Sequence, residues 1–255
     1  MAKALLYDST LCGGCRQCEG ACAKKWGLPY NEKIAQQETI SEHKLTAVQT
    51  FGERFSRRLC MHCVEPTCVS VCPVGALQKT ALGAVIYDEQ RCIGCRYCML
   101  ACPFQVPSYE WNKRLPRIKK CNMCYERQVV GKMTACSEIC PTGATITGER
   151  EALIAEARKR LAEKPTEYYQ RIYGVREVGG TSVLYISAVP FEQIGLRTNL
   201  PQEALPALTW RALSLVPNVA TVGGALLGGV YWITHRREEV AAAEGRGRSP
   251  REGRS

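Results

Sequence analysis

Sixteen cysteines fall into four runs of four and account for every cysteine in the 255-residue chain. In chain order the runs are Cys12, Cys15, Cys18, Cys22; Cys60, Cys63, Cys68, Cys72; Cys92, Cys95, Cys98, Cys102; and Cys121, Cys124, Cys136, Cys140. Runs one and three have the spacing C-x2-C-x2-C-x3-C, in which a short loop binds three corners of one cubane iron–sulfur cluster and the fourth cysteine reaches another. Runs two and four have longer gaps between their second and third cysteines. The pattern predicts four 4Fe-4S clusters with sixteen thiolate ligands to iron.

Two other uses of these cysteines fit the pattern less well. Zinc also binds CxxC pairs, but structural zinc sites close with four ligands from two such pairs and seldom use a third cysteine two residues further on. A disulfide framework suits small secreted chains that cannot build a core, whereas this chain has 255 residues and 45% hydrophobic composition. Iron–sulfur clusters are therefore favoured over zinc and over disulfides.

A repeat in the sequence indicates a duplication. LeuLeuTyrAsp at 5–8 precedes run one as ValIleTyrAsp at 85–88 precedes run three, with an offset of 80 and nine identities in eighteen positions. The two irregular runs also end alike, in CPVGA at 72–76 and in CPTGA at 140–144. Each copy therefore contains a regular run followed by an irregular one.

The order of strands and runs predicts which cysteines share a cluster. Residues 76–88 contain two short strands between runs two and three, so these runs are predicted to form one two-cluster unit. AlaThrIleThr at 144–147 is likewise predicted to pair with AlaLeuLeuTyr at 4–7 and to close a second unit from runs one and four. Because the last cysteine of each run ligates the other cluster, the predicted sets are Cys12, Cys15, Cys18, Cys140 (A); Cys22, Cys121, Cys124, Cys136 (B); Cys60, Cys63, Cys68, Cys102 (C); and Cys72, Cys92, Cys95, Cys98 (D). Sequential pairing of run one with two and of run three with four would use the same sixteen ligands, and it stays open.

The predicted fold class is α+β. Tandem bacterial-ferredoxin-like units, nested and related by a pseudo-two-fold axis, carry small antiparallel hairpins and short helices, and one transmembrane helix follows them. Leu153, Ala157 and Leu161 lie four apart among helix formers and predict a helix at 149–163, and residues 183–189 predict a strand. The expected divisions are a cluster domain at 1–147 with an insertion at 23–59, a helix–strand extension at 148–197, a linker at 198–211, a membrane segment at 212–234 and a basic, disordered tail at 235–255.

Residues 212–234 carry no formal charge, and a bilayer core about 30 Å thick needs about 20 helical residues. Trp210 and Tyr231 lie near its two ends, where interfacial aromatic residues occur. The GxxxG spacing at 224–228 is typical of closely packed membrane helices. The segment is predicted to cross the membrane and to pack on a membrane partner. Because Pro217 interrupts it, a buried soluble helix or a hinge is the alternative.

The flanking arginines predict the orientation of this helix. Arg236, Arg237, Arg246, Arg248 and Arg251 follow it, and Arg197 and Arg211 precede it. The excess of positive charge on the C-terminal side places the C-terminus in the cytoplasm and the cluster domain on the periplasmic or outer face of a single-pass protein. No apolar signal segment precedes Cys12, so the domain is expected to be exported beside a partner that carries the signal. The opposite orientation stays open.

The charge and the motifs exclude other classes of function. The formal net charge of +10 counts cysteines as neutral, whereas each oxidised cubane with four thiolates carries about −2, so four clusters leave about +2. Lysines and arginines are scattered rather than gathered in a stripe, which argues against a nucleic-acid partner. No Gly-rich nucleotide loop or Ser-His-Asp set is present, and His43, His62 and His235 are expected to be structural or solvated. The chain is predicted to relay electrons and not to be an enzyme.

The four runs, the following helix, EVGGTSVLYISAVPFEQIGL at 177–196 and the terminal apolar segment together resemble one family. They are similar to the electron-transfer (beta) subunits of membrane-bound nickel–iron hydrogenases and respiratory formate dehydrogenases. The resemblance implies a hetero-oligomer in which a large catalytic subunit oxidises hydrogen or formate and an integral membrane subunit handles quinone or haem. The cysteine pattern alone is shared with iron–sulfur subunits of other molybdopterin oxidoreductases, and a freestanding membrane-tethered polyferredoxin is the other alternative. The electron donor, the direction of transfer, the potentials and the stoichiometry stay open.

Overall fold

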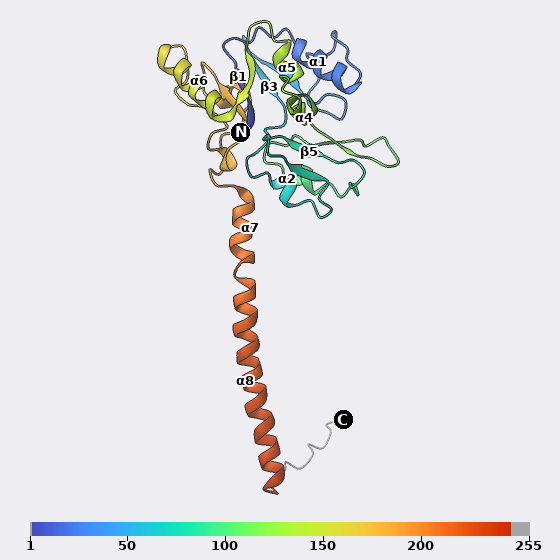
Figure 1. The fold of residues 1–255 in the computed structure, drawn as a ribbon, viewed down its shortest axis with the longest axis vertical. Helices are drawn as coiled ribbons and strands as arrows, with labels where there is room; N and C mark the ends of the chain where they lie inside the picture. The colour runs from blue at the N-terminus through green and yellow to red at the C-terminus, as the bar shows by residue number, and fades with distance from the viewer. Residues whose placement is uncertain (1, 246–255) are drawn as a thin grey trace. The chain divides into compact units, whose positions relative to one another are not determined.

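The computed structural model describes residues 2–245, and the chain divides into two compact units, residues 1–206 and 207–255. The first unit is built of small sheets and mostly short helices (Figure 1). Its strands are β1 (Lys3–Asp8), β2 (Ala47–Phe51), β3 (Arg54–Arg58), β4 (Leu77–Lys79), β5 (Val85–Tyr87), β6 (Ser108–Tyr109), β7 (Ile118–Lys119), β8 (Thr145–Glu149) and β9 (Val183–Ile186). Its helices are α1 (Gln17–Trp26), α2 (Thr67–Ser70), α3 (Tyr97–Leu100), α4 (Tyr125–Val129), α5 (Ala135–Glu138) and α6 (Arg150–Glu163), with 3₁₀ helices at Glu177–Gly179 and Phe191–Ile194. The predicted α+β class, with small antiparallel hairpins and short helices, is confirmed.

The largest sheet has the strand order β8-β1-β9 and is buried on both faces. Because side chains alternate along a strand, β1 sends Ala4 and Leu6 to one face and Leu5 and Tyr7 to the other. The first face packs against the apolar side of α6, which lies beside this sheet in Figure 1. The second face packs into a core that also contains buried cysteines of runs one, two and four. This sheet therefore separates a covering helix from the cysteine-bearing part of the unit.

We expect Leu184→Ala to lower the free energy of unfolding by about 2–5 kcal/mol. The Leu184 side chain is fully buried between β9 and α6, so its removal leaves a cavity that the packed sheet cannot close. Leu100→Ala makes the same change at a side chain that is 85% exposed, and we expect it to change stability by less than about 0.5 kcal/mol. Denaturant unfolding of the two iron-loaded variants compares them. An equal or larger loss at Leu100 would contradict the core described above.

Both strand pairings predicted from the repeat are confirmed. β1 is antiparallel to β8, with Leu5 opposite Thr147, and β4 is antiparallel to β5, with Leu77 opposite Tyr87. The turn between β4 and β5 contains Gly83, as expected. Gly83 has a φ of +88°, and an added Cβ would lie 2.6 Å from the carbonyl oxygen of Lys3. Only glycine fits this turn, because both the backbone conformation and the close approach exclude a side chain.

The insertion at 23–59 is more ordered than its lack of periodicity indicates. Its first residues continue α1, and its last part forms the β2–β3 hairpin, with Gln49 opposite Ser56. The hairpin turn at Gly52 has a φ of +60°, which glycine adopts without strain. Burial does not alternate along β3, because the adjacent residues Ser56 and Arg57 are both buried, so a period-2 search does not find this strand.

The extension at 148–197 contains the predicted helix as α6 and the predicted strand as β9. The strand β9 packs against the first 147 residues and also extends their largest sheet. It joins the large sheet as a parallel neighbour of β1, with Leu6 opposite Leu184. The expected break before it lies at Gly179 and Gly180, whose φ values are +81° and +94°. The helix that precedes β9 lies over one face of the same sheet, so the extension completes the core of the first unit.

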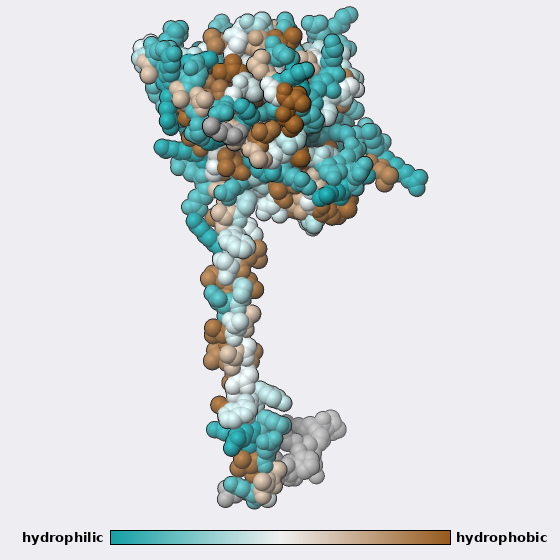
Figure 2. All heavy atoms as spheres, in the orientation of Figure 1, coloured by the Kyte–Doolittle hydropathy of each residue, from teal (hydrophilic) through white to brown (hydrophobic). Residues whose placement is uncertain are grey.

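Two helices, α7 (Leu205–Leu213) and α8 (Val216–Ala243), lie in the C-terminal part of the chain. Among the described residues, Leu205–Ala243 is the one helical stretch long and apolar enough to cross a membrane, with a mean hydropathy of 1.5 over 18 residues. Apolar and small side chains cover most of α8, and polar ones gather near its C-terminal end (Figure 2). Pro217 lies in the first turn of α8, where its missing N–H is not needed. It therefore begins this helix and does not interrupt it.

The helices extend beyond the membrane segment predicted at 212–234. The expected linker is helical from Leu205, and the tail expected to be disordered from residue 235 is helical as far as Ala243. Residues 246–255 of that tail lie outside the described residues. The sequence after His235, RREEVAAA, contains strong helix formers. Its charges end the apolar run, but they do not end the helix.

Candidate iron–sulfur centres

All four cysteine runs contain the same backbone turn. The residue two positions after the first cysteine has a positive φ in each run, namely Gly14 (+69°), His62 (+48°), Gly94 (+73°) and Met123 (+57°). This left-handed conformation is unfavourable for residues with a side chain, yet His62 and Met123 adopt it in the two irregular runs. The irregular runs therefore share the loop geometry of the regular ones.

The third cysteine of each run also has one position. Cys18, Cys68, Cys98 and Cys136 are each the second residue of a helix, in α1, α2, α3 and α5 respectively. In run four, the eleven residues between the second and third cysteines include the whole of α4. The longer gaps in runs two and four are therefore insertions between a shared loop and a shared helix start.

The structure brings the last cysteine of run three to the first three cysteines of run two. Burial raises the pKa of the Cys63 thiol, and Cys60, Cys102 and Cys68 raise it further by charge repulsion. These four are the predicted set C. Thiols that raise one another's pKa in a buried site are stabilised as thiolates when they bind a cation, because the metal removes the repulsion.

The reciprocal grouping occurs around run three. Burial raises the pKa of Cys98 to about 11, with further contributions from Cys92, Cys95 and Cys72. These four are the predicted set D. The Ala76 amide donates a hydrogen bond to the Cys72 Sγ at 3.3 Å, so the CPVGA turn that ends run two presents this sulfur to run three.

The predicted set B surrounds a single cavity. Its lining residues include all four members of the set, namely Cys22, Cys121, Cys124 and Cys136, together with Leu5, Trp26, Thr46, Arg57, Met123, Thr134 and Ala135. Cys121 is buried, which raises its pKa, and Cys22, Cys60, Cys124 and Cys136 add to the increase. Run four thus supplies three thiols to this cavity and run one supplies the fourth.

The predicted set A is the least enclosed of the four. Burial raises the pKa of Cys18 to about 12, with Cys136 and Cys12 among the thiols that add to it. Cys15 is exposed. Burial raises the pKa of Cys140, but hydrogen bonds from Thr145, Thr142 and Ala144 outweigh burial and lower it. The β1–β8 pairing brings the loops that carry Cys15 and Cys140 to the same end of the sheet, because run one follows β1 there and run four precedes β8 there.

Backbone amides donate directly to several of the sulfurs. The Gly94 amide lies 3.4 Å from Cys92 Sγ, and the Met123 amide lies 3.2 Å from Cys121 Sγ. In both cases the donor is the residue of the left-handed turn. Hydrogen bonds to sulfur stabilise the thiolate and help to set the potential of an iron–sulfur site, so the shared turn both shapes the loop and supplies a donor.

The donor sets fit a polynuclear cluster better than a single ion. Within residues 2–245, no three Cys, His, Asp or Glu side chains converge closely enough to hold one metal ion. A cubane needs a wider arrangement, because each of its four thiolates binds a different iron atom. In set B, four buried thiols line one cavity and the Met123 amide is directed at the Cys121 sulfur, which meets that requirement.

Comparisons with known proteins identify the family of this chain. A family model described as a 4Fe-4S dicluster domain matches residues 52–150. The Hydrogenase-2 operon protein HybA of Escherichia coli O157:H7 is 39% identical over 235 residues, which cover 75% of this chain and 72% of that protein. The formate dehydrogenase iron–sulfur subunit of Haemophilus influenzae is 33% identical over 253 residues, which cover 91% and 80%. This chain belongs to the 4Fe-4S dicluster family of HybA and the formate dehydrogenase iron–sulfur subunits.

A further member of the family has a similar sequence identity to this chain. The formate dehydrogenase-O iron–sulfur subunit of Escherichia coli K12 is 35% identical over 200 residues, covering 72% of this chain and 66% of that protein. As a member of this family, the chain is an iron–sulfur electron-transfer subunit akin to HybA and to the formate dehydrogenase iron–sulfur subunits. The matched dicluster region contains runs two, three and four, and run one lies before it.

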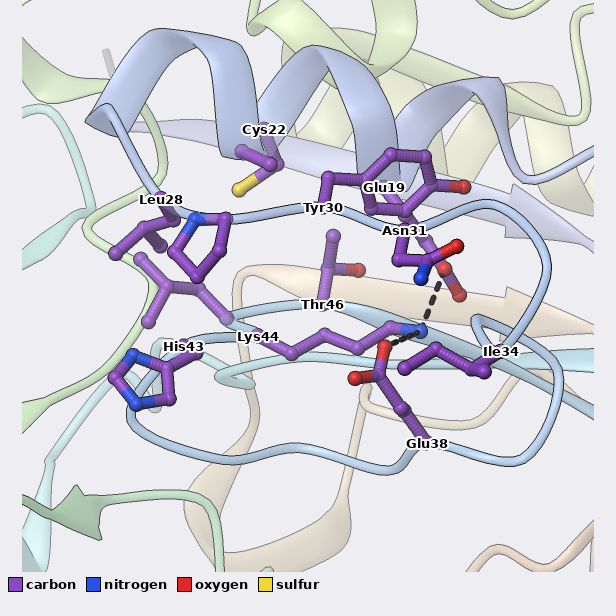
Figure 3. A pocket seen from close by; sticks show the side chains of 13 residues that line it. Glu19, Cys22, Leu28, Tyr30, Asn31, Ile34, Glu38, His43, Lys44 and Thr46 are labelled. Carbon is purple, nitrogen blue, oxygen red and sulfur yellow. Dashed lines mark hydrogen bonds and ion pairs between the residues drawn. The ribbon is translucent and has the colours of Figure 1, made fainter.

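An ion pair between two buried side chains, Lys44 and Glu19, lies beside run one in this dicluster protein. Lys44 lies between two carboxylates in Figure 3, 2.7 Å from Glu19 and 3.4 Å from Glu38. Glu19 also accepts a hydrogen bond from the Val48 amide. Burial raises the pKa of Glu19 even though Lys44 and Val48 lower it. These residues line a cavity of about 220 Å³ that also contains Cys22, so part of the 23–59 insertion covers α1 beside a predicted ligand.

Two cations that no sequence pattern marks lie beside the thiols of this iron–sulfur subunit. Arg57 lines the cavity of set B, and the Lys79 Nζ donates to the carbonyl oxygens of His62 and Cys63, at 3.1 and 2.7 Å. The segment FSRRLC contains two adjacent arginines, and nothing in their order marks one as buried. His62, one of the three histidines, is fully buried and accepts a hydrogen bond from a backbone amide, as a structural histidine does.

Proposed function

We propose that this family member relays single electrons between a catalytic subunit of hydrogenase or formate dehydrogenase type and an integral membrane subunit that handles quinone or haem. A 4Fe-4S cluster, when bound, accepts and releases one electron. The chain would hold four of them, with sets A, B, C and D as ligands, at positions that exclude water and keep neighbouring centres close. The observation that carries this proposal is that thiols of different sets lie close enough to influence one another electrostatically.

Three such pairs of electrostatic neighbours support a linear order of the sets. The Cys18 thiol of set A is an electrostatic neighbour of Cys136 in set B. Cys121 of set B is a neighbour of Cys60 in set C, and Cys68 of set C is a neighbour of Cys98 in set D. Each junction thus joins ligands of two different proposed centres. The order A-B-C-D would give an electron one continuous route through the domain.

The C-terminal helix supports a membrane location. Its apolar side chains are exposed, among them Leu226 at 66% and Leu227 at 73%, and exposed apolar surface of this length is favourable in lipid and unfavourable in water. We propose a single-pass protein in which residues 212–234 cross the bilayer, with the C-terminus cytoplasmic and the cluster domain at 1–147 on the outer face. The extension at 148–197 would belong to that outer part.

Purification from native membranes in mild detergent and without oxygen tests the proposed function. We expect about sixteen iron and sixteen sulfide per chain, because four cubanes contain that number, and stoichiometric partners that include a large metalloprotein. The mass and metal content of that partner distinguish a nickel–iron hydrogenase from a molybdenum or tungsten formate dehydrogenase. Isolation as a single chain that exchanges electrons with several soluble partners would instead identify a freestanding polyferredoxin. Far fewer than sixteen iron atoms, or zinc in their place, would overturn the cluster assignment.

A further inference from the structure

Arg57 is a buried cation within the site of set B. It lies on β3, and its exposed fraction is only 2%. Its side chain lines the same cavity as the four thiols of set B. The Tyr185 hydroxyl donates to the Arg57 carbonyl oxygen at 2.6 Å, so the backbone at this position is fixed to the large sheet. Both the side chain and its strand are therefore held in place.

The hydrogen-bond partners of the guanidinium are neutral. Its Nε donates to Thr46 Oγ1 at 2.9 Å, and its Nη1 donates to Thr145 Oγ1 at 3.1 Å. Two hydroxyl groups orient the guanidinium plane but supply no opposite charge. A charge taken out of water without an opposite charge nearby is strongly unfavourable. The anionic partner of Arg57 must therefore come from another group in the site.

Thiols are the groups in position to supply that charge. Cys22 and Cys136 line the same cavity as the Arg57 side chain, and although burial lowers the pKa of Arg57, the neighbouring thiols raise it further than burial lowers it. Cys18 precedes Cys22 by about one turn of α1, on the same side of the helix. Cys18 belongs to set A, whereas Cys136 and Cys22 belong to set B. Arg57 therefore lies at the junction of two proposed centres.

We propose that Arg57 is a positioning residue for electron transfer. Its positive charge raises the reduction potentials of the centres held by sets A and B above the values that these centres would have without Arg57. This inference rests on the proposed function. Reduction adds one negative charge to a site that is already anionic, and a fixed cation in a poorly screened interior stabilises the reduced form more than the oxidised form. The sets C and D lie beyond the B–C junction, and their potentials should depend little on Arg57.

Arg57→Met tests the proposal, because methionine fills much of the volume without the charge. In a redox titration of the intact complex followed by paramagnetic resonance, we expect the reduced-to-oxidised ratio of at least one of the centres A and B to fall about tenfold at a fixed potential, which is about 59 mV for one electron. The centres C and D should not shift. Arg54→Met removes the same charge from the same strand, at a half-exposed side chain, and should shift no centre.

Arg57→Lys separates charge from packing. Lysine keeps the cation, so the potentials in this variant should return most of the way to the wild-type values. Unshifted A and B potentials in an Arg57→Met protein with full iron content would overturn the role of Arg57 and leave the relay intact. Equal shifts at all four centres, or loss of iron from both Arg57 variants, would also overturn it, because Arg57 would then act on the fold as a whole. A wild-type iron content far below sixteen would instead refute the relay itself.

Discussion

Cys102→Ser is expected to damage the centre held by Cys60, Cys63 and Cys68 and to spare the one held by Cys12, Cys15 and Cys18. A serine hydroxyl is a poor substitute for a thiolate at iron, so the affected site should lose roughly one to four of about sixteen iron atoms. The physical reason for the choice of site is the hairpin β4–β5. It folds run three back on run two, and the Cys102 thiol is an electrostatic neighbour of Cys63.

Cys22→Ser is the matched control for this experiment. In the nested arrangement, Cys22 serves the centre of Cys121 and its neighbours, and it lines the cavity of set B. In the sequential arrangement the two roles are exchanged, because Cys22 would serve the centre of run two and Cys102 that of run four. Paramagnetic spectra resolved by centre should therefore show a different missing signal in each variant. Signals lost in the exchanged order would refute the nested ligand sets.

Truncation after Pro206 is expected to release nearly all of the protein from the membrane while its iron content stays unchanged. Residues 1–206 form a compact unit of their own, and the removed part contains the exposed apolar surface of α8. An alkaline carbonate wash of membranes from cells that also produce the partners provides the measurement, because the wash removes chains that are held only by contacts with other proteins. The full chain should stay in the pellet and the truncated chain should move to the supernatant. Extraction of both proteins would show that α8 does not span the bilayer.

A single substitution sharpens this test. Leu226→Arg places a charge near the middle of the predicted span, where insertion becomes less favourable by about 2.5–3.5 kcal/mol. Val240→Arg makes a comparable change in the same helix, but beyond the charged residues that follow His235. We expect a reduced membrane fraction for the first variant and a nearly normal one for the second. Equal behaviour of the two variants would contradict the predicted position of the span.

Local spacing explains why much of the site can be predicted from the residues alone. Whether a loop can bind three corners of a cluster depends on the positions of its own cysteines, and these are visible in the sequence. The offset of 80 residues relates the two copies, and it led to the β1–β8 and β4–β5 pairings that the structure confirms. The apolar character of α8 is equally local. By contrast, the hairpin β2–β3 has no alternation of buried and exposed residues, so its strands carry no periodic signal.

The amino-acid order alone determined the four cysteine loops, the duplication, the cluster type and the long apolar helix, because each depends on residues close together in the chain or on a direct repeat. Only the tertiary structure decided that β9 joins β1 in parallel, that Lys44 is buried between two carboxylates and that Arg57 rather than Arg54 lies beside the thiols. These three features arise from contacts between segments far apart in sequence. Their energies depend on burial, and burial is a property of the folded core rather than of any local pattern.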